Sequence, residues 1–214
     1  MIKIKAIIFD FDGTIADTLP FTFSKIIEIA KKYKLKDHQQ VIEKLRSMTP
    51  NELLKSFNIS WLKYPFIIWE IKKAQKELYY HLDKIKIFPG IKKLLSDLKK
   101  QRLKFYIYSS NIKKNIDYFL EKNKLSGYFE KVYVGKNLLG KDKDLLWILK
   151  KEGLKKEEVL YVGDEIRDVL ACQKAKIKIV AVGWGLSGYE TLKKYHPDFL
   201  IKKPKDLLKI VLYK

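Results

Sequence analysis

Two closely spaced aspartates at the end of a short apolar segment are the residues of this chain best suited to chemistry. Residues 7–14 read Ile-Ile-Phe-Asp-Phe-Asp-Gly-Thr, so Asp10 and Asp12 lie where the apolar run stops. Two carboxylates at this spacing repel each other, and a bound cation or bound protons must compensate for the repulsion. The same residue types also suit an ordinary strand followed by an Asp-Gly turn. The segment therefore predicts either an acidic reaction centre or a structural turn.

Polar residues follow three more apolar runs later in the chain. In chain order they are Ser109-Ser110-Asn111, Lys141, and Asp164 with Glu165 and Asp168. In open α/β sheets, ligands bind at the carboxyl ends of the strands. Four such groups, each after a predicted strand, favour a reaction centre over a set of unrelated turns.

The elements that must position these groups alternate between strand and helix from Phe88 onward. Apolar runs rich in β-branched residues predict strands, and apolar residues at helical spacing predict helices. The predicted strands after the first are 103–108, 132–134, 159–162, 177–182 and 199–201, and the predicted helices are 91–100, 113–122, 143–151, 167–175, 190–195 and one from Pro204. This alternation implies right-handed crossovers. We therefore predict an α/β fold with a Rossmann-like, doubly wound and mainly parallel sheet.

Residues 17–85 interrupt the alternation. They contain no convincing strand, a capping box at residues 49–52 and a long amphipathic helix over residues 66–82. We predict that residues 1–16 and 86–214 form the core and that residues 17–85 form an inserted, all-helical domain. An insertion directly after the acidic turn is suited to exclude water and to select substrates.

Basic charge is the most conspicuous bulk property of the chain. Its 214 residues include 45 lysines and arginines against 25 aspartates and glutamates, which gives a formal net charge of +20. Specific nucleic-acid readers favour arginine, yet only Arg46, Arg102 and Arg167 are arginines. The lysines recur at the outward spacings of solvated helix faces. We therefore predict that nucleic acid is not the partner.

Composition also narrows the setting in which the protein works. Its single cysteine, Cys172, excludes an internal disulfide framework and a cysteine-based zinc site. No segment approaches the length of a membrane-spanning helix. The residues before Asp10 are too short an apolar run for a secretory signal. The sequence therefore predicts a cytoplasmic protein that does not engage a membrane.

Taken together, the motifs resemble those of the haloacid dehalogenase superfamily, in its phosphatase branch with a helical cap between the first two motifs. The four motifs of that family are matched, in order, by residues 10–14, by Ser109, by Lys141 and by Asp164 with Asp168. The likeness covers the whole chain, including the position of the cap. Residues 180–185 and 196–201 also resemble the C-terminal region of phosphoglycolate phosphatase-like enzymes.

This resemblance implies a phosphatase that hydrolyses a small phosphorylated metabolite through an aspartyl-phosphate intermediate. Asp10 would be the nucleophile, and Asp12 would serve as general acid and then as general base. Mg²⁺, which neutralises the phosphate dianion, would be held by Asp10, Asp12 (through its backbone carbonyl), Asp164 and Asp168. The phosphoryl group would be bound by Ser109, Ser110 and Lys141.

Several alternatives stay open at this stage. Lys143 could replace Lys141, and Glu165 is either a partner of the metal site or a solvated acid. A sugar phosphomutase of β-phosphoglucomutase type would use the same two aspartates. A basic nucleic-acid-binding protein on an inactive phosphatase fold is a third interpretation. Phosphoglycolate is the leading substrate. Arg46 is either a surface residue, which is the favoured interpretation, or a clamp for the substrate carboxylate. A monomer or homodimer is expected.

Overall fold

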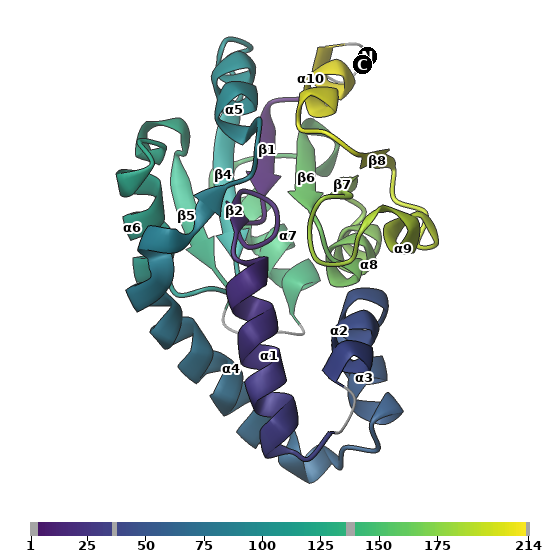
Figure 1. Ribbon diagram of the computed structural model, residues 1–214. Coiled ribbons are helices and arrows are strands. Elements are labelled where there is room, and N and C mark those ends of the chain that lie inside the picture. Colours follow the sequence, from purple (N-terminus) through teal and green to yellow (C-terminus); the bar gives the residue numbers. More distant parts are fainter. Residues whose placement is uncertain (1–3, 36–37, 136–139, 213–214) are drawn as a thin grey trace.

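A six-stranded parallel sheet forms the centre of the molecule (Figure 1). The computed structural model describes residues 4–35, 38–135 and 140–212. The strands are β1 (Ala6–Phe9), β4 (Lys104–Ser109), β5 (Lys131–Val134), β6 (Val159–Gly163), β7 (Lys178–Val182) and β8 (Phe199–Ile201). Their spatial order is β5-β4-β1-β6-β7-β8, and every neighbouring pair is parallel. The predicted doubly wound sheet is confirmed.

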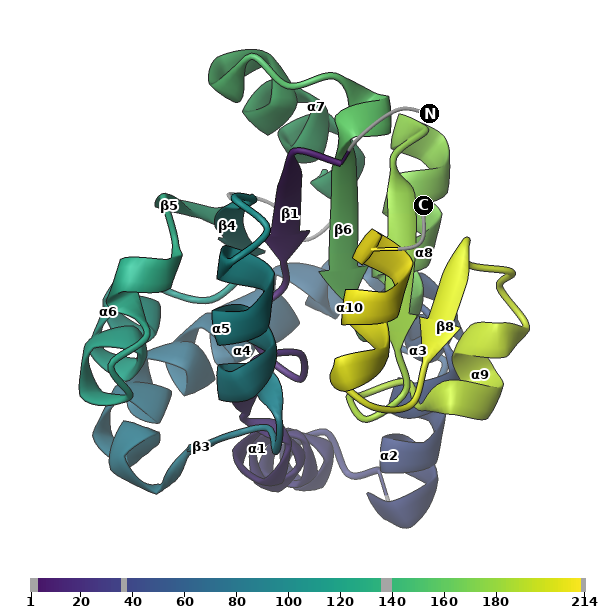
Figure 2. The ribbon, with the colours of Figure 1, turned by 90° about the horizontal axis from the view of Figure 1, so that it is seen from above.

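Helices cover both faces of this sheet, as Figure 2 shows from above. Three of them, α5 (Ile91–Lys99), α6 (Lys113–Lys122) and α10 (Lys205–Leu212), pack on one face, whereas α7 (Lys141–Glu152), α8 (Ile166–Ala175) and α9 (Tyr189–Lys193) pack on the other. Successive side chains of a strand point to opposite faces. Ile7 and Phe9 of β1 accordingly join the first core cluster, and Ala6 and Ile8 join the second. Apolar residues at every position of β1 are thereby explained.

The position of β1 determines where a ligand can bind. Its neighbours are β4 on one side and β6 on the other, so the chain winds outward in both directions from β1. Ligands of such sheets bind beyond the carboxyl ends of the strands, where the winding reverses. The residues directly after Phe9 therefore lie at the point of this fold that is best suited to binding.

Helices of the insertion lie beyond the carboxyl ends of the central strands (Figure 1). They are α1 (Leu19–Lys32), α2 (His38–Ser47), α3 (Pro50–Ser56) and α4 (Tyr64–Leu78), with 3-10 turns at Trp61–Lys63 and Tyr79–Lys84. The expected capping box is present, because the Thr49 backbone N–H donates to Glu52 over 2.8 Å and the Glu52 N–H donates to the Thr49 hydroxyl over 3.4 Å. The helix predicted over residues 66–82 is wrong at its end. It stops at Leu78, where the chain tightens into the 3-10 turn that contacts α6 through Asp83.

A two-stranded antiparallel ribbon joins the insertion to the sheet. It consists of β2 (Ala16–Asp17) and β3 (Lys86–Ile87), with Ala16 opposite Ile87 and Asp17 opposite Lys86. The expectation of no strand after residue 16 is therefore wrong by one residue, because two residues of ribbon are too few to produce a visible alternation. The entry and exit of the insertion are side by side at this ribbon. Within the described residues, no helix is long and apolar enough to cross a membrane.

Candidate active site

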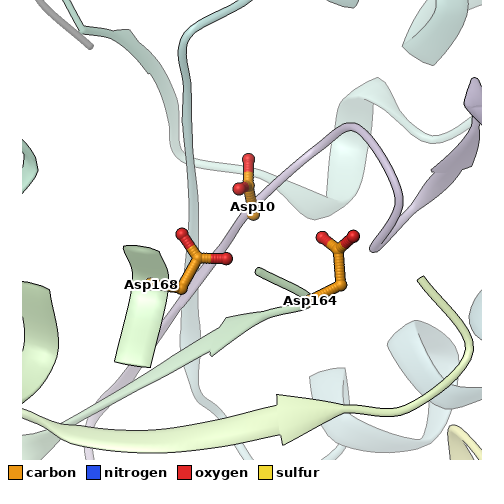
Figure 3. A group of neighbouring side chains, drawn as sticks. All are labelled: Asp10, Asp164 and Asp168. Atoms are coloured by element: carbon orange, nitrogen blue, oxygen red, sulfur yellow. The ribbon is translucent and has the colours of Figure 1, made fainter. Parts of the chain in front are cut away.

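Three buried carboxylates meet at the carboxyl edge of the sheet, where Figure 3 shows them facing a common space. Asp10 directly follows β1, Asp164 directly follows β6, and Asp168 lies in the first turn of α8. One carboxylate oxygen from each residue lies within 4.8 Å of the others. The parallel pairing of β1 with β6 brings the ends of these strands together. Residues that are more than 150 positions apart in the sequence thus form one acidic cluster.

Two hydrogen-bond donors fix the carboxylate of Asp10. The backbone N–H of Phe11 donates to Oδ1 over 2.7 Å, and Lys141 Nζ lies 3.0 Å from Oδ2. Burial raises the pKa of Asp10 to about 7, although the charge of Lys141 opposes this effect and that of Asp168 adds to it. The surroundings of Asp10 therefore destabilise its ionised form.

Asp164 is held by the turns that follow two neighbouring strands. Its Oδ1 accepts a hydrogen bond from the Thr14 hydroxyl over 2.8 Å, and its Oδ2 accepts one from the backbone N–H of Leu186 over 2.7 Å. Burial and the charges of Glu165, Asp10 and other acids raise its pKa well above the usual value. Thr14 therefore orients this carboxylate, a role that the sequence alone did not assign.

Glycine is required at residue 13 because of the close approach of Asp164. The backbone of Gly13 has φ +74°, and a Cβ added there would lie 2.1 Å from Asp164 Oδ2. A side chain at this position would clash with a carboxylate oxygen of the cluster as well as strain the backbone.

We expect Gly13→Ala to lower catalytic turnover about 100-fold, because a displacement of about 1 Å at a reacting centre has an effect of this size. Gly153→Ala is the matched control, since Gly153 also has positive φ (+65°) but nothing lies within 4 Å of its added Cβ. The control should lose stability, by about 1 kcal/mol, and keep its activity. Equal kcat/KM values for the two folded variants would contradict the steric argument.

Lys141 is the cation of the cluster. Helix α7 begins at Lys141, two residues before its predicted start, and this first turn directs Nζ toward Asp10 and Asp168. Burial alone would lower the pKa of Lys141, but the two carboxylates raise it above its usual value, so the amine is charged. Lys143, the alternative, is exposed. Asp142 pairs with Lys174 over 2.7 Å instead of joining the cluster.

Asp12 lies outside the cluster of three carboxylates and faces the end of β4. Both of its carboxylate oxygens are 3.0 Å from Nδ2 of Asn111, and the Ser109 hydroxyl is 3.4 Å from Oδ2. Burial raises the pKa of Asp12, and the hydrogen bond from Asn111 opposes this shift. Its side chain is therefore not part of the group of acids that could hold a metal ion.

The remaining candidates line the same edge of the sheet. The hydroxyl of Ser109 accepts a hydrogen bond from the Asn111 N–H over 3.0 Å, whereas that of Ser110 lies 3.4 Å from Arg167 Nη2. Arg167 pairs with Glu165 through Nε and Oε2 at 2.5 Å. Glu165 is thus paired with Arg167 and half-buried, so the alternative of a solvated acid is wrong.

Asn111 contacts Asp12, a role that the sequence analysis did not assign to it. Its position after two serines at the end of a strand was a usable signal.

The residues present fit a hard divalent cation such as Mg²⁺. Carboxylate oxygens are the preferred ligands of Mg²⁺, and Asp10, Asp164 and Asp168 offer three of them in one buried place. The single charge of Lys141 is too small to balance three carboxylates. Burial and the neighbouring carboxylates raise the pKa values of Asp10 and Asp164, and a bound cation would favour the ionised form of both.

A doubly wound sheet with buried acids and a lysine at its carboxyl edge places this chain among the α/β proteins that bind ligands at that edge. Comparison with known sequences supplies the particular family. The profile of the haloacid dehalogenase-like hydrolases matches residues 7–182, and this chain belongs to that family. The expected membership is confirmed.

Two relatives that match along almost their whole length are named as phosphatases. A phosphoglycolate phosphatase of Synechococcus elongatus is 33% identical over 213 residues, which cover 97% of each chain. A pyrophosphatase, PpaX, of Oceanobacillus iheyensis is 26% identical over 98% of this chain and 97% of its own. These matches confirm the expectation of a phosphatase-type hydrolase.

Solved structures agree on the fold. A "predicted phosphatase" of Clostridium acetobutylicum superposes with a TM-score of 0.82 at 20% identity, over 99% of this chain and 100% of its own. A haloacid dehalogenase-like hydrolase of Streptococcus pneumoniae gives 0.79 at 20% identity, over 98% and 99%. The arrangement of sheet and helical insertion is therefore shared with these proteins along the whole chain.

Proposed function

We propose that this protein is a Mg²⁺-dependent phosphatase that hydrolyses a small phosphomonoester through an aspartyl-phosphate intermediate on Asp10. The observation that carries the proposal is the buried contact of Asp10 with Lys141 beside two further carboxylates, with Asp12 only two residues away. A nucleophile, a fixed positive charge and a nearby proton carrier are the groups that this reaction needs. The phosphoglycolate phosphatase relative supports the same activity.

The carboxylates of Asp10, Asp164 and Asp168, with the backbone carbonyl of Asp12, would hold the metal. When bound, Mg²⁺ supplies positive charge that neutralises the phosphate dianion. The hydrogen bonds from Thr14 and Leu186 keep Asp164 turned toward this space. Such outer contacts orient ligand carboxylates and support metal affinity.

In the first half of the reaction, a carboxylate oxygen of Asp10 attacks phosphorus while the bond from phosphorus to the ester oxygen breaks. Asp12 donates its proton to the departing oxygen, which leaves as an alcohol. The raised pKa of Asp12 supports this role, because an acid that holds its proton more tightly is better matched to neutral pH. The products of this half are an Asp10 acyl phosphate, the alcohol and an ionised Asp12.

In the second half, the ionised Asp12 accepts a proton from water as the water oxygen attacks phosphorus. The bond between phosphorus and the Asp10 oxygen breaks, inorganic phosphate forms, and both aspartates return to their starting state. Lys141, whose Nζ lies 3.0 Å from Oδ2 of Asp10, neutralises charge on the nucleophile and on the transferring group. Ser109, Ser110 and the adjacent backbone would bind phosphoryl oxygens.

A second anionic group is the property that we propose for the substrate. Phosphoglycolate carries a carboxylate beside its phosphate, and pyrophosphate carries two phosphate groups; relatives of this chain are named for both. Arg46, on α2 of the insertion, reaches the loop before α9. Its Nη2 lies 3.4 Å from the position that a Cβ atom added to Gly188 would take. The same loop provides the Leu186 N–H that binds Asp164. Arg46 is therefore a candidate clamp for the second anion.

We also propose that residues 17–85 act as a cap over a core of residues 1–16 and 86–214, in a cytoplasmic monomer or homodimer. The ribbon of β2 and β3 supports these boundaries, because it brings the two connections between the parts together. A cap at the carboxyl ends of the strands would shield the reacting groups from bulk solvent and shape the substrate site.

Screening phosphorylated metabolites with and without Mg²⁺ tests the proposed function. We expect phosphate release from phosphoglycolate or another ester with a second anion, loss of at least 90% of it in excess EDTA, and recovery after Mg²⁺ is restored. Transfer of the phosphoryl group between sugar phosphates without release would indicate the phosphomutase. An absence of turnover across the panel, together with salt-sensitive DNA binding, would contradict the proposal in favour of a nucleic-acid-binding role.

A further inference from the structure

A buried amide connects the helical insertion to Asp12. Asn115 lies in the first turn of α6 and is 1% exposed. The Nδ2 of Asn115 donates a hydrogen bond to Oδ1 of Asn111 over 2.9 Å. The Nδ2 of Asn111 donates in turn to the Asp12 carboxylate over 3.0 Å. The same Nδ2 of Asn115 donates over 2.7 Å to the backbone carbonyl of Gln75 in α4. Asn115 thus contacts, through its two amide hydrogens, both the segment that binds Asp12 and the insertion.

The direction of every hydrogen bond in this chain of contacts is determined. A backbone carbonyl only accepts, so Asn115 must present its NH₂ group to Gln75. The Asn111 amide oxygen accepts from Asn115 and, over 2.7 Å, from the N–H of Ile112. Asn111 must therefore turn its NH₂ group toward Asp12. The amides form one ordered relay, and reversing one of them would place two oxygens against each other.

The relay begins at the place where the insertion docks on α6. Asn115, Tyr118 and Lys122 are spaced three and four residues apart, which puts them on one face of the helix. Tyr118 and Lys122 bind the Asp83 carboxylate over 2.9 and 2.8 Å. Gln75 adds a side-chain hydrogen bond to the Ser110 carbonyl over 3.1 Å. Of these α6 contacts, only that of Asn115 continues to Asp12.

We propose that Asn115 is a positioning residue that holds Asp12 in place through Asn111 and makes this hold depend on the docked position of the insertion at Gln75. This inference rests on the proposed function, in which Asp12 protonates the departing oxygen. When the insertion is docked, both amide hydrogens of Asn115 are hydrogen-bonded and Asn111 is fixed against Asp12. When the insertion moves away, Asn115 loses the carbonyl that orients it, and the amide of Asn111 is held less firmly against Asp12.

Asn115→Asp tests the relay because it keeps the size of the side chain and replaces the donor by an acceptor. The measurement is kcat/KM for substituted phenyl phosphates whose phenols range from strongly acidic p-nitrophenol to phenol itself. A weakly acidic phenol needs protonation by Asp12 as it leaves, whereas p-nitrophenol does not. Since general acid catalysis contributes about 10²–10⁴-fold, we expect the loss for phenyl phosphate to exceed that for p-nitrophenyl phosphate by about 10-fold or more.

Tyr118→Phe is the matched control, because it removes one of two contacts to Asp83 on the same face of α6, while Lys122 keeps the insertion docked and the relay is untouched. Its rates should keep the wild-type dependence on the leaving group. Asn115→Ala, which removes the donor without adding charge, replaces Asn115→Asp if the latter does not fold, and should shift the dependence in the same direction. Equal losses for all esters in the Asn115 variants would overturn the inference alone. A wild-type protein inactive on the whole series would overturn the proposed function and the inference with it.

Discussion

Asp10→Asn is expected to reduce kcat/KM for p-nitrophenyl phosphate by on the order of 10⁴-fold or more, as the loss of a covalent nucleophile does in other enzymes. The amide keeps the size of the side chain, but it lacks the charge to attack phosphorus. Because Asp10 is one of three buried carboxylates that repel each other, its neutralisation should leave the melting temperature equal or higher. Loss of activity without loss of stability would separate chemistry from folding.

A matched control for this variant is Asp142→Asn. Asp142 lies beside Lys141 in the sequence but pairs with Lys174 rather than with the acidic cluster. Its replacement should leave kcat within about 3-fold of the wild type, in line with the small effects of surface ion pairs. If Asp10→Asn kept more than about 1% of wild-type turnover, Asp10 would not be the nucleophile, since a group that forms the covalent intermediate cannot be bypassed at that level.

Lys141→Met is expected to lower kcat/KM by about 10²–10³-fold, which corresponds to about 3 kcal/mol of transition-state stabilisation. Methionine retains most of the apolar stem but removes the charge that lies 3.0 Å from Asp10 Oδ2. Without that charge, Asp10 and Asp168 repel each other, and the transferring phosphoryl group loses a fixed counterion. Steady-state kinetics at saturating Mg²⁺ measures the effect.

Lys143→Met provides the comparison, because this lysine is two residues further along the same helix and exposed. Its activity should match that of the wild type. If instead Lys143→Met were the damaging change and Lys141→Met the harmless one, the charged group of the reaction would be Lys143. Thermal melting of both variants would show whether either loss comes from unfolding.

The strands of the six-stranded sheet were predictable because local sequence is sufficient to specify them, whereas the short ribbon of β2 and β3 was not. Continuous apolar runs such as 159–162 can be buried only between two layers of helices, so their type and place followed from residue types alone. Ends of elements depend on contacts that a local pattern does not contain. Helix α4 stops at Leu78 where the chain docks on α6, and α7 begins at Lys141, whose amine is held by the acids of two distant segments.

Within the candidate site, the sequence by itself determined the residue types and their order along the chain. Asp10, Asp12, Lys141, Asp164 and Asp168 are recognisable because each follows a strand, and strand ends of a parallel sheet meet at one edge. Only the tertiary structure decided which of them touch. In the folded chain, the Asp12 side chain lies apart from the three clustered acids and accepts hydrogen bonds from Asn111. Asn115 binds the backbone carbonyl of Gln75. These partners are 40 to 99 residues apart. The first of these contacts follows from the pairing of β1 with β4 and the second from the docking of α4 on α6, and a local pattern of residue types specifies neither.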